Sequence, residues 1–337
     1  MSARTREKAP LATTNIATMS TMRAVTAGTL VSRLSVPIAI VVLVIVGALV
    51  SPSFLTTSNL LNVLNANAAV GLVALGMTFV AVVGGLADLS VPANVAMGAL
   101  VTLGMQGTLG AELAALLGLA VATAGGLVNG VLVGYLRINP IIATLGTGTV
   151  LLGLSQLIVG GGIVYGTPNA LADAVSGSLL GIPVFVWIFA IVALILTPLL
   201  SRTAFGRWTH AVGGNYQAAE ASGIPVRFTK AAAFLLTGLL AGACGVLLGL
   251  SNGQARPIIG TGYEFVAITA VVIGGTSLFG GSGSILRTVG GVIITALISN
   301  LIIFVGLPTQ ATGLITGAIV LVAVGVDVYF RRKAGRE

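Results

Sequence analysis

Few residues in this chain can do acid–base, nucleophilic or metal chemistry. Among 337 residues there are eight acidic side chains, one histidine (His210) and one cysteine (Cys244). This inventory excludes a metal site built from several His or Cys ligands of this chain, and Cys244 lies among small apolar residues, where packing is its expected role. None of the three lysines follows the glycine-rich loop that cradles nucleotide phosphates. The sequence therefore predicts neither catalysis nor a cofactor or metal on this chain.

The segment from Asp88 to Pro92 has the residue types of a helix start. A serine such as Ser90 can cap the first helical turn, and proline is favoured at an early helical position, where its missing N–H needs no partner. A carboxylate such as Asp88 is favoured near the positive end of the helix dipole. We expect Asp88 and Ser90 mainly to cap this helix, and the alternative is a direct functional role.

A second segment, residues 213–224, predicts a short surface helix. Two glycines precede an alanine-rich stretch, and a Ser-Gly pair ends it. Such a helix suits docking into a groove of another protein; the alternative, a helix lying on the membrane surface, would need bulky apolar anchors that are absent here. The residues predicted to dock or to shape the turn are Gly213, Gly214, Asn215, Tyr216, Ala219, Glu220, Ser222 and Gly223.

Uncharged polar side chains recur inside the apolar runs of the chain. Amides and hydroxyls can bind the hydroxyls of a sugar in a passage, and they can equally join neighbouring helices. The candidates for lining a passage are Asn65, Asn67, Asn94, Thr144, Gln156 and Asn300. No carboxylate lies clearly at the middle of a run, so only Asp88 and Glu264 remain for a proton-coupled carrier. We therefore expect a neutral solute and an energy source outside the chain.

The elements that must position these residues are membrane helices. Hydrophobic residues make up 56% of the chain and charged residues 7%, against about 25% charged in soluble domains. Continuous apolar runs of helix-spanning length predict an all-α, polytopic membrane protein with about ten transmembrane helices, rather than a β-barrel of alternating strands. The runs lie near 34–51, 60–82, 92–108, 113–135, 139–159, 182–200, 230–251, 264–280, 286–305 and 310–328.

The positive charges fix the expected orientation. If both the N- and C-termini are cytoplasmic, every Lys and Arg except Arg256 falls on the cytoplasmic side, as expected when cationic loops are retained there during insertion. The same cations are dispersed over short loops and tails, which argues against a nucleic-acid partner.

This orientation divides the chain into three parts. Residues 1–33 are expected to be a basic, disordered cytoplasmic tail, 34–328 the transmembrane domain, and 329–337 a second basic tail. The transmembrane domain contains an outer loop at 160–181 and a cytoplasmic loop at 201–229. Neither loop is long enough to be a catalytic domain.

Several segments, taken together and in order, resemble the permease subunit of ribose/xylose-type ABC sugar importers. They are Gly76–Phe79 with Gly84–Gly85 and Asp88–Val91; Asn139–Gly146; Thr203–Arg207 with Ala211–Asn215; Ala218–Ala219 with Ser222–Ile224; Gly260–Glu264; and Val272–Leu278 with Gly280–Gly281. The chain departs from the family pattern at Ala87, at Pro92–Ala93 and at Ser282.

The resemblance implies a homodimer of ten-helix subunits in the bacterial inner membrane. It also implies two partners: a cytoplasmic ABC ATPase, which holds ATP-Mg and docks on the 201–229 loop, and an extracytoplasmic binding protein that delivers a monosaccharide. Two alternatives remain from the residues alone: a self-sufficient secondary carrier or channel for a small neutral solute, and a membrane anchor or scaffold. The sequence leaves the identity of the sugar open.

Overall fold

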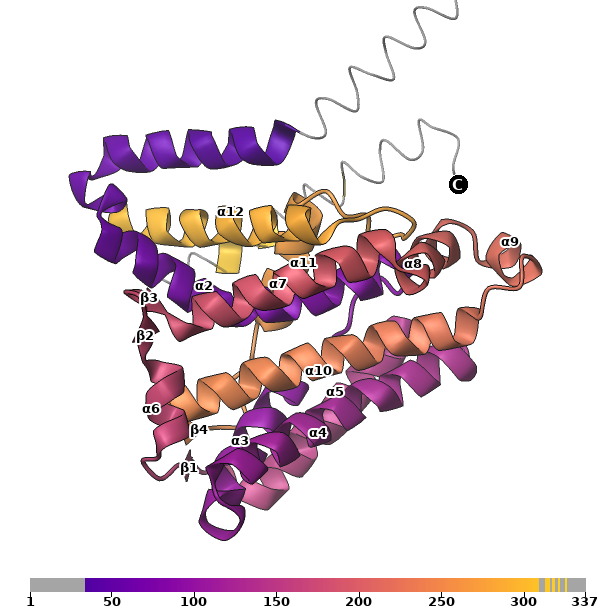
Figure 1. The fold of residues 1–337 in the computed structure, drawn as a ribbon, viewed down its shortest axis with the longest axis horizontal. Helices are drawn as coiled ribbons and strands as arrows, with labels where there is room; N and C mark the ends of the chain where they lie inside the picture. The colour runs from indigo at the N-terminus through magenta and orange to yellow at the C-terminus, as the bar shows by residue number, and fades with distance from the viewer. Residues whose placement is uncertain (1–33, 309–312, 316, 319–320, 322–324, 326–337) are drawn as a thin grey trace, which may run out of the picture.

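The computed structural model describes residues 34–308, 313–315, 317–318, 321 and 325, and this part of the chain is almost entirely helical (Figure 1). A first helix, Leu34–Val50, is followed by η1 (Pro52–Leu55), α2 (Thr57–Val82), α3 (Val91–Leu109), α4 (Ala111–Gly130), the π-helical turn η2 (Val131–Tyr135), α5 (Pro140–Val159), α6 (Ala170–Ser176), α7 (Val184–Arg202), α8 (Ala204–Gly214), α9 (Tyr216–Ala221), α10 (Val226–Asn252), α11 (Tyr263–Ile273) and α12 (Ile285–Phe304). The described strands are β1 (Val164–Tyr165), β2 (Ser178–Leu179), β3 (Ile182–Pro183) and β4 (Gln254–Ala255).

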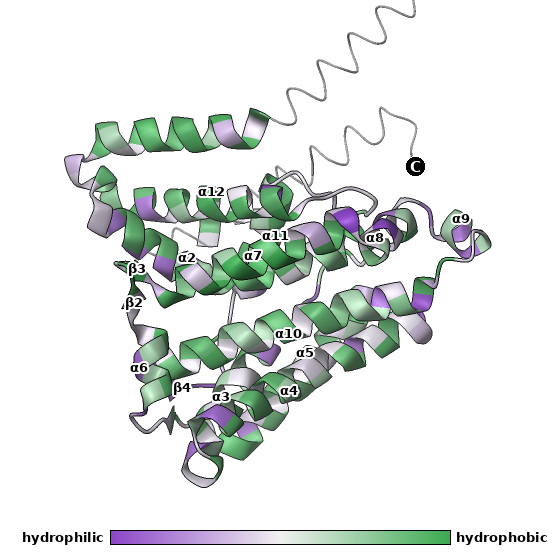
Figure 2. Ribbon diagram, viewed as in Figure 1, coloured by the Kyte–Doolittle hydropathy of each residue, from purple (hydrophilic) through white to green (hydrophobic). Residues whose placement is uncertain are grey.

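The predicted all-α membrane architecture is confirmed at the level of a multi-pass helical protein. Six of the described helices are long and apolar enough to cross a membrane. Figure 2 shows hydrophobic residues along the long helices, whereas hydrophilic residues gather near α8 and α9. The number ten stays a prediction, and the predicted run 310–328 lies largely outside the described residues, as do the predicted tails 1–33 and 329–337.

One predicted run ends earlier than expected. The apolar pattern suggested a helix over 264–280, but α11 ends at Ile273. Gly275 takes a left-handed conformation (φ +78°), and the Thr276 N–H turns back to the Val271 carbonyl at 3.1 Å. Glycine accepts this conformation without a steric penalty. The next residues therefore form a loop up to Ser284, just before α12, instead of continuing the helix.

The centre of the bundle is built on α10, which packs against α2 as well as α3 and α4. Small residues on α4 and α10 let these two helices pack closely. A Cβ added at Gly126 of α4 would lie 2.7 Å from the Gly238 Cα of α10, and one at Gly130 would lie 2.6 Å from the Ala231 carbonyl oxygen. The two backbones touch directly, as small residues allow in membrane helices.

The loop at 160–181 is ordered and closes one end of the bundle. Its strand β1 pairs antiparallel with β4, with Val164 opposite Ala255 and Tyr165 opposite Gln254. The Gln106 side chain at the end of α3 accepts a hydrogen bond from the Thr167 N–H at 3.0 Å. The cytoplasmic loop predicted at 201–229 forms the opposite end, where α9 projects beyond the other helices (Figure 1).

Candidate functional site

The short helix predicted at 213–224 is present as α9, and its sequence explains its start and its end. The Asn215 side chain accepts a hydrogen bond from the Ala218 N–H at 2.9 Å and caps the helix, while the Asn215 N–H closes α8 on the Ala211 carbonyl at 3.0 Å. The helix ends at Ala221, and Gly223, two residues later, has φ +76°. One asparagine therefore joins two helices through a sharp turn, and a left-handed glycine terminates the second.

One side of α9 is anchored and the other is free. Ala219 is buried, whereas Gln217, Ala218, Glu220 and Ala221 are exposed. Because the buried side packs on the bundle, the exposed residues form a small protruding surface, which we call the α9 face. Docking through this face stays a prediction.

The turn before α9 makes direct backbone contact with the end of α2 and with the α11–α12 loop. A Cβ added at Gly213 would clash with the Val82 carbonyl oxygen at the end of α2 and lie 2.6 Å from the Gly281 nitrogen. The Gly281 N–H donates to the same Val82 carbonyl at 2.9 Å. The end of α8 is therefore in direct contact with the end of α2 and with the α11–α12 loop, which are themselves hydrogen-bonded to each other.

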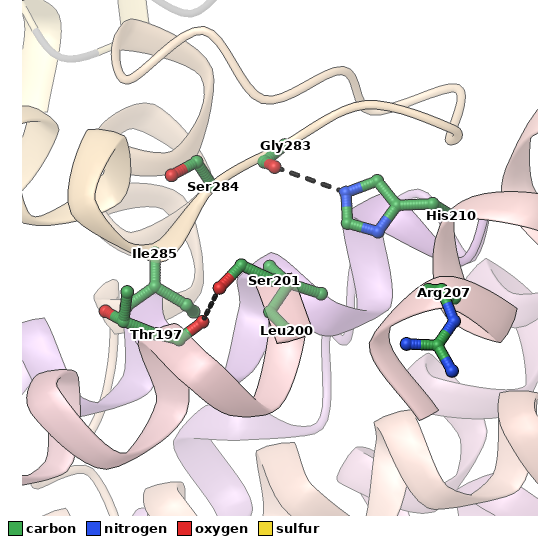
Figure 3. Close-up of a pocket in the computed structure, with 8 residues that line it drawn as sticks. All are labelled: Thr197, Leu200, Ser201, Arg207, His210, Gly283, Ser284 and Ile285. Carbon is green, nitrogen blue, oxygen red and sulfur yellow. Dashed lines mark hydrogen bonds between the residues drawn. The ribbon is translucent and has the colours of Figure 1, made fainter. Parts of the chain in front are cut away.

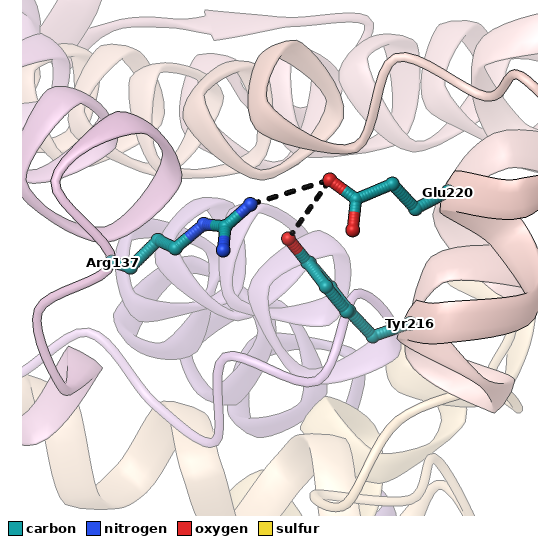
Figure 4. Close-up of polar contacts among 3 residues, drawn as sticks. All are labelled: Arg137, Tyr216 and Glu220. Carbon is teal, nitrogen blue, oxygen red and sulfur yellow. Dashed lines mark hydrogen bonds and ion pairs between the residues drawn. The ribbon is translucent and has the colours of Figure 1, made fainter.

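A charged cluster links α9 to the segment between η2 and α5 (Figure 4). The Arg137 guanidinium lies 3.3 Å from Glu220 Oε1, which also accepts a hydrogen bond from the Tyr216 hydroxyl at 3.4 Å. The Tyr216 ring receives two cations, Arg137 at 5.8 Å and Lys230 at 5.1 Å from its centroid. We call Arg137, Tyr216, Glu220 and Lys230 the latch cluster. All of them except Glu220 border a cavity of about 310 Å³ that also reaches Gly84.

The backbone of Arg137 is itself unusual. It has φ +57°, a left-handed conformation that is rare for a residue with a Cβ. The Ile138 N–H bonds the Leu132 carbonyl at 3.0 Å and holds this turn. Neither Arg137 nor Lys230 was among the predicted site residues. The one sequence signal was that Arg137 is the only charge in the short loop between two apolar runs.

His210 ties α8 to the α11–α12 loop (Figure 3). Its Nδ1 lies 2.8 Å from the Gly206 carbonyl oxygen and its Nε2 lies 3.3 Å from that of Gly283. It borders a cavity of about 420 Å³ together with Ser201 and Ser284. This histidine therefore contributes a second link, beside Gly213, between α8 and the α11–α12 loop. Among the described residues, His, Cys, Asp and Glu do not gather into a group that could hold a metal ion.

The expectation that Ser90 caps α3 is wrong. Ser90 has helical backbone angles and makes no side-chain capping bond. Instead, the Asp88 carboxylate oxygen Oδ1 accepts hydrogen bonds from the Ser90 N–H at 2.9 Å and from the Ser90 hydroxyl at 2.6 Å. The amide nitrogens of Asn94 and Asn129 donate to the same hydroxyl at 3.0 and 2.7 Å. We call these four residues the Asp88 cluster.

The six candidates for a passage lie in different environments. Asn94 and Thr144 are buried near Asp88, and the Thr144 hydroxyl accepts a hydrogen bond from the Leu89 N–H at 3.1 Å. Asn300 exchanges two hydrogen bonds with Asn59, at 3.0 and 3.1 Å, which joins α2 to α12. Asn65 and Gln156 are exposed, and half-buried Asn67 donates to the Val63 carbonyl. Which of them contact a solute stays a prediction.

Comparison with known proteins places the chain in a family. Residues 59–324 match the family described as branched-chain amino acid transport system / permease component. The ribose import permease of Bacillus subtilis is 39% identical over 85% of this chain and 89% of its own length. The D-allose transport system permease of Escherichia coli is 36% identical (85% and 88% covered), and the L-arabinose ABC transporter permease of Azospirillum brasilense 34% (90% and 90%).

No solved structure is significantly similar to the chain. The extent of the sequence matches nevertheless confirms the resemblance to sugar-importer permeases. The chain therefore belongs to the family of transport-system permease components that includes the ribose, allose and arabinose permeases.

Proposed function

We propose that this chain is the membrane subunit of a bacterial ABC importer and forms the passage for a monosaccharide. The observation that carries the proposal is the match to sugar permeases over most of both chains. The names of these relatives cover a pentose and a hexose, so the proposal extends to monosaccharides and not to one sugar. The α9 face supports it, because a permease needs a docking element when its energy comes from another subunit.

We place the protein in the inner membrane with about ten spans and with both termini cytoplasmic. The distribution of Lys and Arg supports this orientation, since Arg256 alone lies on the outer side. In this orientation α9 lies on the cytoplasmic side and β1, β4 and α6 on the outer side. The outer end would then receive a sugar-binding protein, and the α9 face would receive the ATPase that holds ATP-Mg.

The geometry suggests how motion would pass from the ATPase into the bundle. A displacement of α9 acts on α5 through the Glu220–Arg137 pair, and on α2 and α12 through the contacts of Gly213 and Gly281. Closure of the ATPase pair on ATP would therefore rock several helices together. Such rocking would expose the passage to one side of the membrane at a time, as in other transporters with a site near the midplane.

One face of α5 supports a passage or contact shared with a second copy. Gly146, Thr149, Gly153 and Gln156 recur at three- and four-residue steps, which places them on one side of the helix. A Cβ added at Gly146 or Gly153 would meet nothing within 4 Å. Lipid-facing positions are usually bulky and apolar, whereas small and polar residues favour helix contact or a polar passage. We therefore place Gln156 at a homodimer contact or passage.

Affinity purification of the tagged chain from its native membrane tests the proposal. Recovery of an ATPase, together with a soluble sugar-binding protein when ATP hydrolysis is blocked, is the expected result. A matched purification of the chain carrying Gln217→Arg, which adds bulk and charge to the α9 face, should lose the ATPase. A purified permease without any ATPase, under conditions that retain a known ABC complex, would favour the self-sufficient carrier.

A further inference from the structure

The Asp88 cluster leaves hydrogen-bond acceptors unpaired deep in the protein. Asp88, Ser90, Asn94 and Asn129 are all 0% exposed. Four buried side-chain oxygen or nitrogen atoms among the described residues have no partner, and three of them belong to this cluster: Asp88 Oδ2, Asn94 Oδ1 and Asn129 Oδ1. All three are oxygens. The cluster therefore lacks donors, and a group that supplies a proton or a positive charge would satisfy it.

The two oxygens of the Asp88 carboxyl group are bonded very unequally. Oδ1 accepts from the Ser90 N–H, the Ser90 hydroxyl and, at 3.5 Å, the Asn129 amide, whereas Oδ2 accepts nothing. An ionised carboxylate shares its charge between both oxygens and needs donors on both. In a neutral carboxylic acid, the carbonyl oxygen accepts and the other oxygen carries a hydrogen. The observed pattern matches the neutral acid.

The surroundings offer no charge that would balance an ionised Asp88. The cluster, whose Asn129 belongs to α4, is contacted by Met77 of α2, whose sulfur accepts the Asp88 N–H at 3.2 Å. Thr144 of α5 accepts a hydrogen bond from the adjacent Leu89 N–H. These side chains are neutral. The one ion pair among the described residues, Arg137–Glu220, lies outside this cluster. The start of α3 favours a negative charge, but one helix end does not replace the water that a fully buried carboxylate loses.

We propose that the Asp88 cluster is a buried proton-binding site, in which Asp88 is a neutral carboxylic acid with the hydrogen on Oδ2. The proton removes an unbalanced charge from the junction of α3, α4 and α5. Its role is to hold these helices together as a neutral polar cluster. The proposal does not depend on what the protein transports.

Infrared spectroscopy of the purified full-length permease in lipid nanodiscs tests it at neutral pH, where exposed carboxyl groups are ionised. The carbonyl stretch of a protonated carboxyl group is compared between the wild type and Asp88→Asn. Asn is the matched replacement because it keeps one acceptor and supplies donors in the same volume. Asp173→Asn, at an exposed position in the outer loop, is the control. The band should be lost in Asp88→Asn only.

A second measurement separates a proton from a metal cation as the neutralising group. The thermal unfolding midpoint of the wild type should be the same in sodium and in choline buffers. A sodium-dependent rise in the midpoint that disappears in Asp88→Asn would overturn the proposal in favour of a sodium site.

The spectra remain decisive if Asp88→Asn fails to fold. Glu264 holds the fourth unpaired buried oxygen, so Glu264→Gln removes the other buried carboxyl group. A protonated-carboxyl band that persists in Glu264→Gln supports the assignment to Asp88. A wild type without such a band, or a band lost only in Glu264→Gln, contradicts it.

Discussion

The contact of Gly213 with the end of α2 gives a sharp test of how the 201–229 loop, the proposed docking element, is coupled to the bundle. The proposed change is Gly213→Ala, and the matched control is Gly214→Ala at the next residue. At Gly213 the new methyl group would overlap the Val82 carbonyl oxygen and lie 2.6 Å from the Gly281 nitrogen. At Gly214 the nearest atom, the Gly281 Cα, is 4.0 Å away, an ordinary contact.

The expected loss of stability in Gly213→Ala follows from the space around the new methyl group. Reaching an ordinary van der Waals separation requires the end of α8 to move by about 1.5 Å relative to α2 and the α11–α12 loop. All three neighbouring groups are backbone, so no side chain can rotate away. Overpacking of this kind costs about 1–3 kcal/mol of folding free energy. Gly214→Ala should change stability by less than about 0.5 kcal/mol, as surface substitutions commonly do.

The assay measures ATP hydrolysis and sugar uptake on the same membranes. Gly213→Ala should lower uptake for each ATP hydrolysed, because the displaced end of α8 would no longer transmit its motion to α2. Gly214→Ala should match the wild type in both activities. If the two variants have equal stability and equal uptake for each ATP, the rigid contact at Gly213 does not couple the loop to the bundle.

Three further predictions concern other contacts. Glu220→Gln should change the unfolding free energy by less than about 1 kcal/mol, because the pair with Arg137 is about half exposed, yet it should reduce uptake while ATP hydrolysis continues; unchanged uptake would contradict the role of the latch cluster. Gly126→Ala should lower the unfolding midpoint and Gly146→Ala should not, since only the first methyl group meets a neighbouring helix; equal midpoints would contradict the α4–α10 contact. A double-mutant cycle of Asn59→Ala and Asn300→Ala should give a coupling energy of about 0.5–1.5 kcal/mol in unfolding, and additive effects would contradict the reciprocal pair.

Local signals in the sequence predicted α9 correctly. Its start depends on Asn215 and its end on Gly223, and both act within a few residues of their own position. The contacts that complete the site are not local. Arg137 and Glu220 are 83 residues apart. The sequence around one of them does not indicate that it pairs with the other. A single sequence contains no information on such a pair until the fold brings α9 beside the loop before α5.

The same distinction explains the incorrect expectation at Ser90. The residue types around it fit a helix cap, but Asn129, which lies 39 residues away, and Asn94 compete for its hydroxyl. These tertiary contacts, rather than the local sequence, determine which hydrogen bonds the Ser90 side chain makes. The early end of α11 shows a similar limit, because the apolar pattern continued past Ile273 and only the left-handed Gly275 marked the stop.

The most direct test of the central claim is uptake of labelled ribose, allose or arabinose into liposomes that contain this chain. The account predicts uptake only when the partner ATPase, the binding protein and ATP-Mg are all present. It also predicts loss of uptake when any one of them is omitted. Accumulation by the chain alone would contradict the assignment as an ABC importer subunit and would identify a self-sufficient carrier.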